Sequence, residues 1–259
     1  MIKVQNPSTE PCETFALASK TIAEKADRLR GTGKFYDERS AVSDFLDLLQ
    51  QRCPDRVRTW QRGLNESRNG ADLEMWFVAN DRWVGFRIQA KLHQGNSDSY
   101  GHLDHPGGTG QQVENLLANT PKGLVAMHLF FAGLSAAETC GSLCICPAPC
   151  HYWAISIADS NVVQRLVRYE TMGGKDVRPI LKPLVCAFCC EPSGDVVDRA
   201  IAFSRAVAGR VPSVRRTPPR NALDLIRYGQ PLRDQVKVGA DAILVLGGSE
   251  EDLSARPEL

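Results

Sequence analysis

The chain has 259 residues, 43% of them hydrophobic and 24% charged, and its formal net charge is +1. A chain of this length can bury a full core without disulfide or metal staples, either as one large domain or as a core with a substantial appendage. The balanced charge excludes a strong overall electrostatic attraction to nucleic acid, so any basic surface must be local.

No secretion or membrane signal is expected. Residues 1–15 lack a basic run followed by an apolar core, which excludes a secretory signal. The longest apolar run, Gly123–Ala137, is shorter than the ~20 residues that span a bilayer, and it contains His128. We therefore expect a cytoplasmic protein without membrane contact.

Two helices are expected at the start of the chain. The first covers residues 13–30 and the second Asp37–Arg52, with Asp37 as its N-cap and Pro54 beyond its end. Apolar positions of the second recur at helical spacing: Val42, Phe45, Leu46 and Leu49. Glu38 lies four residues before Val42 and is expected to project from the same face.

Three strands, a helix and a further strand are expected next. Arg56–Leu64 is the first strand, and residues 71–79 and 83–92 form a hairpin rich in Trp, Phe, Val and Ile. After a polar loop, a helix from about Thr109 to Ala118 leads into residues 124–132. Their continuously apolar character is typical of a buried parallel strand.

The second half of the chain differs in composition. Thr139–Cys150 is rich in cysteine and proline, and the acid-free segment Arg210–Arg220 is expected to be a linker. Strands are expected at residues 151–159 and 241–247, helices at residues 161–169 and 195–208, and a short apolar segment at residues 183–190. We therefore expect a core over residues 1–135 and a cysteine-rich α+β extension over residues 136–259 that packs on it.

The nine cysteines are expected to be thiols or metal ligands, because a reducing compartment disfavours a disulfide framework. Six have spacings that suit tetrahedral zinc: Cys140, Cys144, Cys146, Cys150, Cys186 and Cys189. A structural Zn²⁺ held by a subset of them is one interpretation, and buried small apolar side chains are the other. Arg215, Arg216 and Arg220 either contact a phosphate backbone or belong to a solvated linker.

The residues that point most directly to chemistry lie at the ends of the predicted hairpin. Asp72 opens its first strand, and Gln89-Ala90-Lys91 closes its second. A hairpin brings these ends together, so a carboxylate, an amide oxygen and a lysine are expected at one edge of a sheet. Hard oxygen ligands beside a lysine suit Mg²⁺ and the phosphate that it neutralises. The alternative is a solvent-facing polar rim on an ordinary hairpin.

This pattern resembles the PD-(D/E)XK nuclease superfamily, in the variant where glutamine replaces the second acid, as in Mrr-like restriction endonucleases. It is similar to an uncharacterised bacterial group of that superfamily over residues 36–132. The matching residues are Glu66, Gly70-Ala71-Asp72, Trp76-Phe77, Gln89-Ala90-Lys91, Tyr100, Leu103 and Gln111-Gln112. Ala71 stands where the motif has proline. The resemblance implies an α/β fold with a restriction endonuclease-like αβββαβ core, a mixed central sheet flanked by helices.

The resemblance also implies a metal-dependent endonuclease that hydrolyses phosphodiester bonds in nucleic acid, with DNA as the expected substrate and defence against foreign DNA as the expected setting. Asp72, Gln89 and the Ala90 carbonyl would hold Mg²⁺ or Mn²⁺. Lys91 would act on the attacking water or the phosphate, and Gln112, or else Gln111, would point to the same atoms. A homodimer would suit double-strand cleavage. The alternative is a catalytically inactive nucleic-acid-binding or structural module of the same fold.

Glutamine at position 89 brings no charge to a metal, so a second carboxylate is expected to help. Glu66, six residues before Asp72, is the best placed, and Glu38 on the preceding helix is second. We expect the side chains of Glu66, Asp72 and Gln89 to converge on one polar pocket, with the Lys91 amine beside them.

Overall fold

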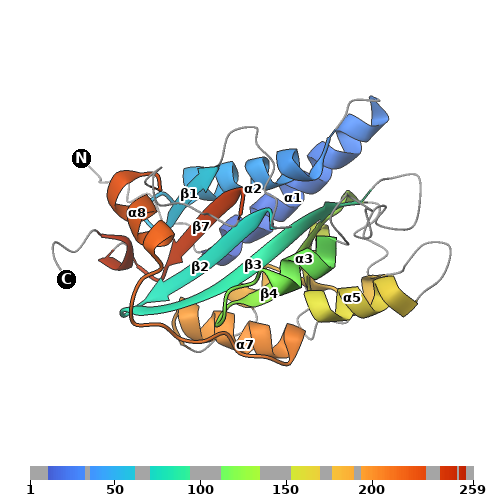
Figure 1. Cartoon of the computed structure of the whole chain (residues 1–259). Coiled ribbons are helices and arrows are strands. Elements are labelled where there is room, and N and C mark those ends of the chain that lie inside the picture. Colours follow the sequence, from blue (N-terminus) through green and yellow to red (C-terminus); the bar gives the residue numbers. More distant parts are fainter. Residues whose placement is uncertain are drawn as a thin grey trace, which may run out of the picture.

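A seven-stranded mixed sheet forms the centre of the computed structural model, in the order β1-β7-β2-β3-β4-β5-β6 (Figure 1). The strands are β1 Val57–Gln61, β2 Leu73–Ala79, β3 Arg82–Leu92, β4 Val125–Phe131, β5 Ile155–Asp159, β6 Lys182–Pro183 and β7 Ala242–Gly247. The structure describes residues 11–32, 36–61, 71–93, 112–134, 153–169, 177–189, 194–231, 240–249 and 251–254. The protein therefore has an α/β fold.

Seven α-helices occur in the described part of the chain. They are α1 Pro11–Gly31, α2 Glu38–Arg52, α3 Gln112–Ala118, α5 Ser160–Tyr169, α6 Cys186–Cys189, α7 Val196–Ala208 and α8 Arg220–Tyr228, with short 3₁₀ turns at η2 Arg178–Ile180 and η4 Glu251–Leu253. None of these helices is both long enough and apolar enough to cross a membrane.

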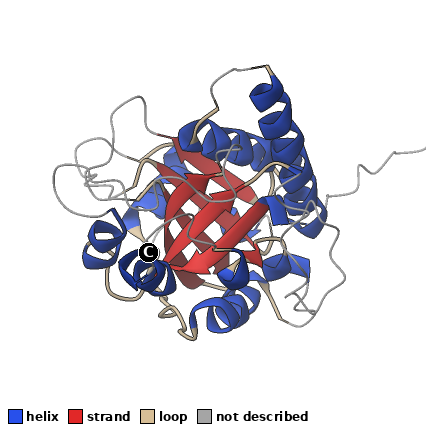
Figure 2. Cartoon of the chain, turned by 90° about the vertical axis from the view of Figure 1, so that its right-hand side faces the viewer, coloured by secondary structure: helices blue, strands red, loops and turns tan. Residues whose placement is uncertain are grey.

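Helices cover both faces of the sheet (Figure 2). On one face, α1, α2, α6 and α7 bury a large core against the strands, including Phe15, Phe45, Phe77, Phe86 and Phe203. On the other face, α3 and α8 pack on Trp76 and its neighbours, and α5 packs on Phe130. Because both faces are covered, β2, β4, β5 and β7 are buried at every position, which explains why most of their residues are apolar.

The predicted hairpin is confirmed as β2 and β3, which pair antiparallel from Leu73↔Ile88 to Ala79↔Arg82. Asn80 and Asp81 form the turn with φ angles of 50° and 60°. Asn and Asp tolerate this left-handed conformation better than most residues, and it matches the twist of the two strands. The hairpin register is therefore fixed by local turn chemistry.

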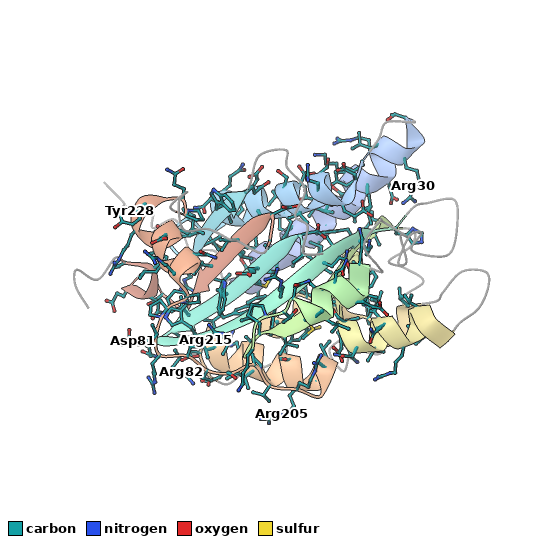
Figure 3. All side chains as sticks on the ribbon, viewed as in Figure 1. Arg30, Asp81, Arg82, Arg205, Arg215 and Tyr228 are labelled. Carbon is teal, nitrogen blue, oxygen red and sulfur yellow. The ribbon has the colours of Figure 1, made fainter. Side chains whose placement is uncertain are left out.

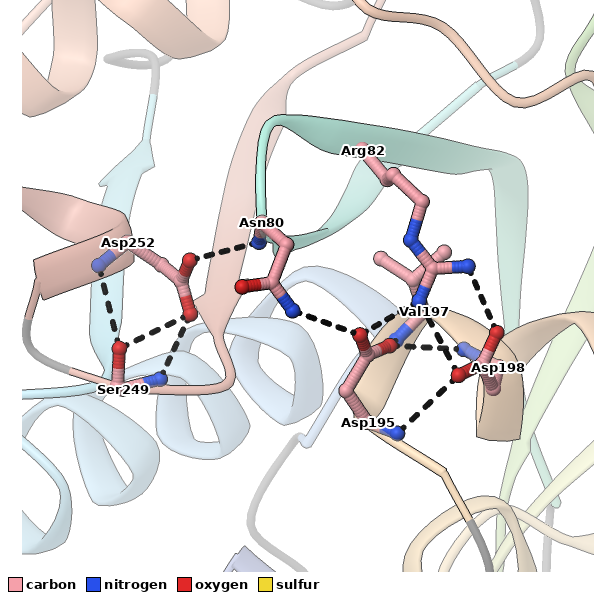
Figure 4. A network of polar contacts seen from close by, with 7 residues as sticks. All are labelled: Asn80, Arg82, Asp195, Val197, Asp198, Ser249 and Asp252. Atoms are coloured by element: carbon pink, nitrogen blue, oxygen red, sulfur yellow. Dashed lines mark hydrogen bonds and ion pairs between the residues drawn. The ribbon is translucent and has the colours of Figure 1, made fainter.

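The turn end of the hairpin is held by polar contacts to two other segments (Figure 4). Arg82 binds Asp195 and Asp198 at the start of α7, with 2.8 Å between its Nη1 and Asp198 Oδ1. The Asn80 backbone N–H donates to Asp252 Oδ1 of η4 over 3.0 Å. Arg82 and Asp81 lie at this end of the molecule in Figure 3, and the Asp72 end of β2 lies at the opposite end of the strand.

Most of the predicted helices and strands are confirmed. The second helix begins at Glu38, with the Asp37 carboxylate accepting from the Ser40 N–H, as a capping residue does. β4 runs parallel to β3, as the apolar run predicted. Two helices were missed: the short α6 lies in the segment expected only to be apolar, and α8 begins at Arg220, directly after the segment expected to be a linker. Within that segment, Arg215 exchanges backbone hydrogen bonds with Trp83 of β3.

The C-terminal half contributes strands to the same sheet. β7 lies between β1 and β2, antiparallel to the first and parallel to the second, while β5 and β6 extend the sheet beyond β4. The expected boundary at residue 135 thus falls between two hydrogen-bonded strands of one sheet. β7 also separates β1 from the hairpin, and a restriction endonuclease-like core remains a prediction.

The cysteine predictions are tested only in part. Cys140, Cys144, Cys146 and Cys150 lie outside the described residues, and Cys186 is buried at the start of α6. Cys12 of α1 is disulfide-bonded, so the expectation of thiols or metal ligands alone is wrong for this residue. A structural zinc ion stays a prediction.

Candidate active site

Asp72 is fixed at the open end of the hairpin by two hydrogen bonds to β3. Its backbone N–H donates to the Ile88 carbonyl over 2.9 Å, and its carboxylate Oδ2 accepts from the Ala90 N–H over 2.7 Å. The carboxylate therefore takes the place of a backbone acceptor where the β2–β3 ladder ends. As predicted, Asp72 stands at the same end of the hairpin as Gln89 and Lys91.

Gln112, at the start of α3, joins two polar side chains near the end of β3. Its Oε1 accepts from Lys91 Nζ and from Gln89 Nε2, both over 2.8 Å. Lys91 is 5% exposed and Gln89 3% exposed, so these two side chains are shielded from solvent, while Gln112 is half-buried. Gln112 thus contacts both Lys91 and Gln89, while its role in a site stays a prediction, and Gln111 lies outside the described residues.

One acceptor in this cluster is unsatisfied. Gln89 Oε1 is buried and has no hydrogen-bond partner within the described part of the chain. A buried amide oxygen without a partner costs about 1–3 kcal/mol. A bound cation or water would remove that cost.

His128 of β4 lies beside this cluster and was treated in the sequence only as part of an apolar run. It pairs in register with Gln89 and is fully buried, with its Nδ1 2.8 Å from the Ser160 hydroxyl of α5. Burial, and then the charge of Lys91, lower the pKa of His128 to about 3. The imidazole is therefore neutral at physiological pH and adds a polar group without adding charge.

Burial destabilises the charged forms of Asp72 and Lys91. Burial raises the pKa of Asp72 to about 6, opposed by the Ala90 hydrogen bond and the charge of Lys91. Burial also lowers the pKa of Lys91, opposed by Asp72 and Glu38. Both charged forms are thus less stable than in water, which is common where a protein uses such groups for binding or catalysis.

Two further acids act on Asp72. Glu38, the first residue of α2, and Asp241, directly before β7, both raise the pKa of Asp72 by repulsion. Glu38 was predicted as the second choice for an additional acid, while Glu66, the first choice, lies outside the described residues. The predicted convergence of Glu66 with Asp72 therefore stays a prediction.

Asp241 was not predicted. β2 and β7 are parallel and paired from Leu73↔Ala242, so Asp72 and Asp241 precede neighbouring strands at matching positions. Both acids line a cavity of about 250 Å³ whose other walls are Arg39, Ser40, Val42, Ser43, Gln61 and Ala242. The only signal in the sequence was an aspartate at the start of the last apolar strand, and it gives no indication of which strand lies next to it.

The donor set suits a hard divalent cation in an open site rather than a closed cage. No group of three or more His, Cys, Asp or Glu side chains within the described residues is arranged to hold a metal ion. Mg²⁺ is usually bound through one or two carboxylates while keeping several waters and taking substrate phosphate oxygens. Asp72 and Asp241 are two carboxylates of that kind at the cavity, and Gln89 is not among the residues that line it.

Comparison with known proteins gives a family but no activity. No curated protein and no solved structure is detectably similar to this chain. A family model does match, over residues 11–251, which include every strand of the sheet and each residue of the site described above. The chain belongs to the family of unknown function DUF6615.

Proposed function

We propose that this protein is a metal-dependent nuclease that hydrolyses phosphodiester bonds in nucleic acid, with DNA as the expected substrate and defence against foreign DNA as the expected role. The observation that carries the proposal is the hydrogen-bonded cluster of the buried Lys91 and Gln89 with the half-buried Gln112, beside the half-buried Asp72. A solvent-facing rim on an ordinary hairpin would not need to bury a lysine, because burying a charged group costs free energy.

Asp72 and the Gln89 amide oxygen, with the Ala90 carbonyl as the resemblance implies, would hold Mg²⁺ or Mn²⁺, and Glu38 adds negative charge nearby. When bound, the ion would supply a Lewis acid for the scissile phosphate and lower the pKa of a water. Burial favours the neutral amine of Lys91, so its Nζ can accept a proton from the attacking water or, once protonated, stabilise charge on the phosphate. Gln112 holds that nitrogen in place through its 2.8 Å hydrogen bond.

The test is cleavage by purified full-length protein of plasmid, linear duplex, single-stranded DNA and RNA. Each substrate is incubated with Mg²⁺, with Mn²⁺, and with either ion plus EDTA. Lys91→Ala is compared with Lys20→Ala, which removes the same charge from a side chain that is 56% exposed on α1. We expect metal-dependent cleavage by wild type and Lys20→Ala, and none by Lys91→Ala of equal thermal stability.

Cleavage that survives in Lys91→Ala would contradict a catalytic role for Lys91: the reaction would then either proceed without this residue or come from a contaminating nuclease. Absence of cleavage in all substrates, with retained binding of nucleic acid in a mobility-shift assay, would favour the non-catalytic binding module. The sequence feature that favours this alternative is the neutral glutamine at position 89, where the motif has an acid.

A further inference from the structure

His128 and Gln89 are neighbours in the sheet, and each has one buried polar atom without a partner. They pair in register between the parallel strands β3 and β4, so their side chains project from the same face of the sheet. Gln89 is 3% exposed and His128 is fully buried. Gln89 Oε1 and His128 Nε2 have no hydrogen-bond partner within the described part of the chain. Two such atoms on neighbouring residues carry a free-energy cost that one bridging group would remove.

The contact between His128 and Ser160 decides which ring nitrogen carries the hydrogen. Ser160, the first residue of α5, is fully buried, and its hydroxyl oxygen lies 2.8 Å from His128 Nδ1. No other hydrogen bond of this hydroxyl occurs among the described residues, and buried hydroxyl groups nearly always donate their hydrogen. Ser160 therefore donates to Nδ1, which leaves the hydrogen of the neutral ring on Nε2.

The two atoms without partners are thus a donor and an acceptor. Gln89 Nε2 donates to Gln112 Oε1 over 2.8 Å, which leaves Gln89 Oε1 as the acceptor of that amide. Lys91 Nζ donates to the same Gln112 oxygen over 2.8 Å. A cation between His128 and Gln89 is disfavoured, because Nε2 already carries a hydrogen and the charge of Lys91 acts on the ring. Water, which can accept one hydrogen bond and donate another, fits both atoms.

We propose that one bound water accepts from His128 Nε2 and donates to Gln89 Oε1, and that His128 is thereby a positioning residue for Lys91. The water holds the Gln89 amide so that its Nε2 meets Gln112, and Gln112 holds the Lys91 amine. This inference rests on the proposed nuclease function and deepens it, because a buried histidine that touches no substrate sets the position of the catalytic amine. An amide oxygen has two lone pairs, so the water leaves one for the metal ion.

A purely structural histidine is the simpler interpretation. The His128 ring stacks on Phe130 with 6.1 Å between the ring centroids, and its Nδ1 contact joins β4 to Ser160 of α5. If packing were its whole role, replacing His128 and Ser160 together by apolar groups of similar shape would be nearly neutral. Lys91 would then be unaffected. The positioning role predicts instead that the same two substitutions disturb Lys91.

The first test is cleavage by the double variant His128→Phe with Ser160→Ala, which keeps an aromatic ring and removes both nitrogens together with the hydroxyl. We expect kcat to fall at least about tenfold with KM unchanged, as when an outer residue that orients a site is removed. The amide N–H of His128→Gln replaces the Nε2 donor, so this variant should recover most of kcat. Wild-type kcat in the double variant, or an equal loss in His128→Gln, would overturn the inference.

Two measurements on the wild-type protein need no cleavage. A long-range ¹H–¹⁵N spectrum of the histidine rings should show the hydrogen of His128 on Nε2, with the signal identified by its loss in His128→Gln. A crystal structure should place one water within hydrogen-bond distance of His128 Nε2 and Gln89 Oε1. A hydrogen on Nδ1, or no such water, would overturn the inference, and both readings hold even if the double variant does not fold.

The reactivity of the Lys91 amine tests the last step of the network. Acetylation by acetic anhydride is followed by mass spectrometry, with Lys20, whose side chain is 56% exposed, as the reference in the same sample. The Lys91 rate should rise several-fold in the double variant and return toward the wild-type rate in His128→Gln, and an unchanged rate in the double variant would contradict the positioning role. If Lys91 responds as expected but wild type cleaves no nucleic acid, the nuclease proposal alone is overturned.

Discussion

Replacing Asp72 by asparagine is expected to stabilise the metal-free protein. Burial raises the pKa of Asp72 to about 6 from an ordinary value of 3.8, so the folded state binds this proton more tightly than the unfolded state does. By linkage, the gap between these values corresponds to a cost of up to about 3 kcal/mol whenever the carboxylate is ionised. Asparagine avoids that cost and still offers an oxygen to the Ala90 N–H.

The sign of the pH dependence follows from the raised pKa. Below pH 3.8 Asp72 is protonated in both states and contributes no penalty, whereas above about pH 6 it is ionised in both and the penalty is complete. Asp72→Asn should therefore match wild type near pH 4 and exceed it at pH 8. For a chain of this size, each kcal/mol corresponds to roughly 2–4 °C in Tm.

The assay is urea and thermal unfolding in EDTA at pH 4 and pH 8, followed by circular dichroism. Asp47→Asn is the control, and as an exposed substitution it should change stability by no more than about 0.5 kcal/mol at either pH. Adding Mg²⁺ at pH 8 should stabilise wild type more than Asp72→Asn. The difference in unfolding free energy between the two proteins should therefore become smaller. The reasoning would be refuted if Asp72→Asn were no more stable than wild type at pH 8. It would also be refuted if the stability difference between the two proteins were the same at pH 4 and pH 8.

Three further outcomes are expected. The cleavage rate at low Mg²⁺ should rise with pH through about 6 as Asp72 ionises. The pH midpoint of this rise should fall as the Mg²⁺ concentration is raised. A cleavage rate that does not depend on pH would contradict the role of Asp72. Arg82→Ala should cost about 1 kcal/mol in urea unfolding at pH 7. That cost should vanish in acid as Asp198 protonates, since the Arg82 hydrogen bond lowers the pKa of Asp198. Gly85→Ala should cost about 1–3 kcal/mol in the same assay, because a Cβ there would lie 2.5 Å from the Trp76 ring; wild-type stability would exclude that close packing.

The elements that the sequence predicted correctly are those with strong local signals. Asp37 caps α2, and the two positive-φ residues of the hairpin turn are Asn80 and Asp81. Once the hairpin forms, Asp72, Gln89 and Lys91 all lie at its open end, just beyond the Leu73–Ile88 pair. This part of the candidate site was therefore predictable from residues close together in the chain.

The missed features depend on contacts between distant segments or on weak local signals. α8 follows an arginine- and proline-rich segment, and its N-cap position, Pro219, makes no side-chain capping hydrogen bond. His128 looked like one polar residue in an apolar strand, and only its register with Gln89 brings it to the site. The local sequence therefore indicates neither where α8 begins nor that His128 pairs with Gln89.

The sequence alone determined the hairpin and the helix that carries Glu38, because turn chemistry, capping and periodicity act over a few residues. Only the tertiary structure decided that β7 enters the sheet beside β2 and brings Asp241 next to Asp72. Parallel pairing joins segments more than 160 residues apart, and its register is set by burial of both faces of β7 rather than by any turn between the strands.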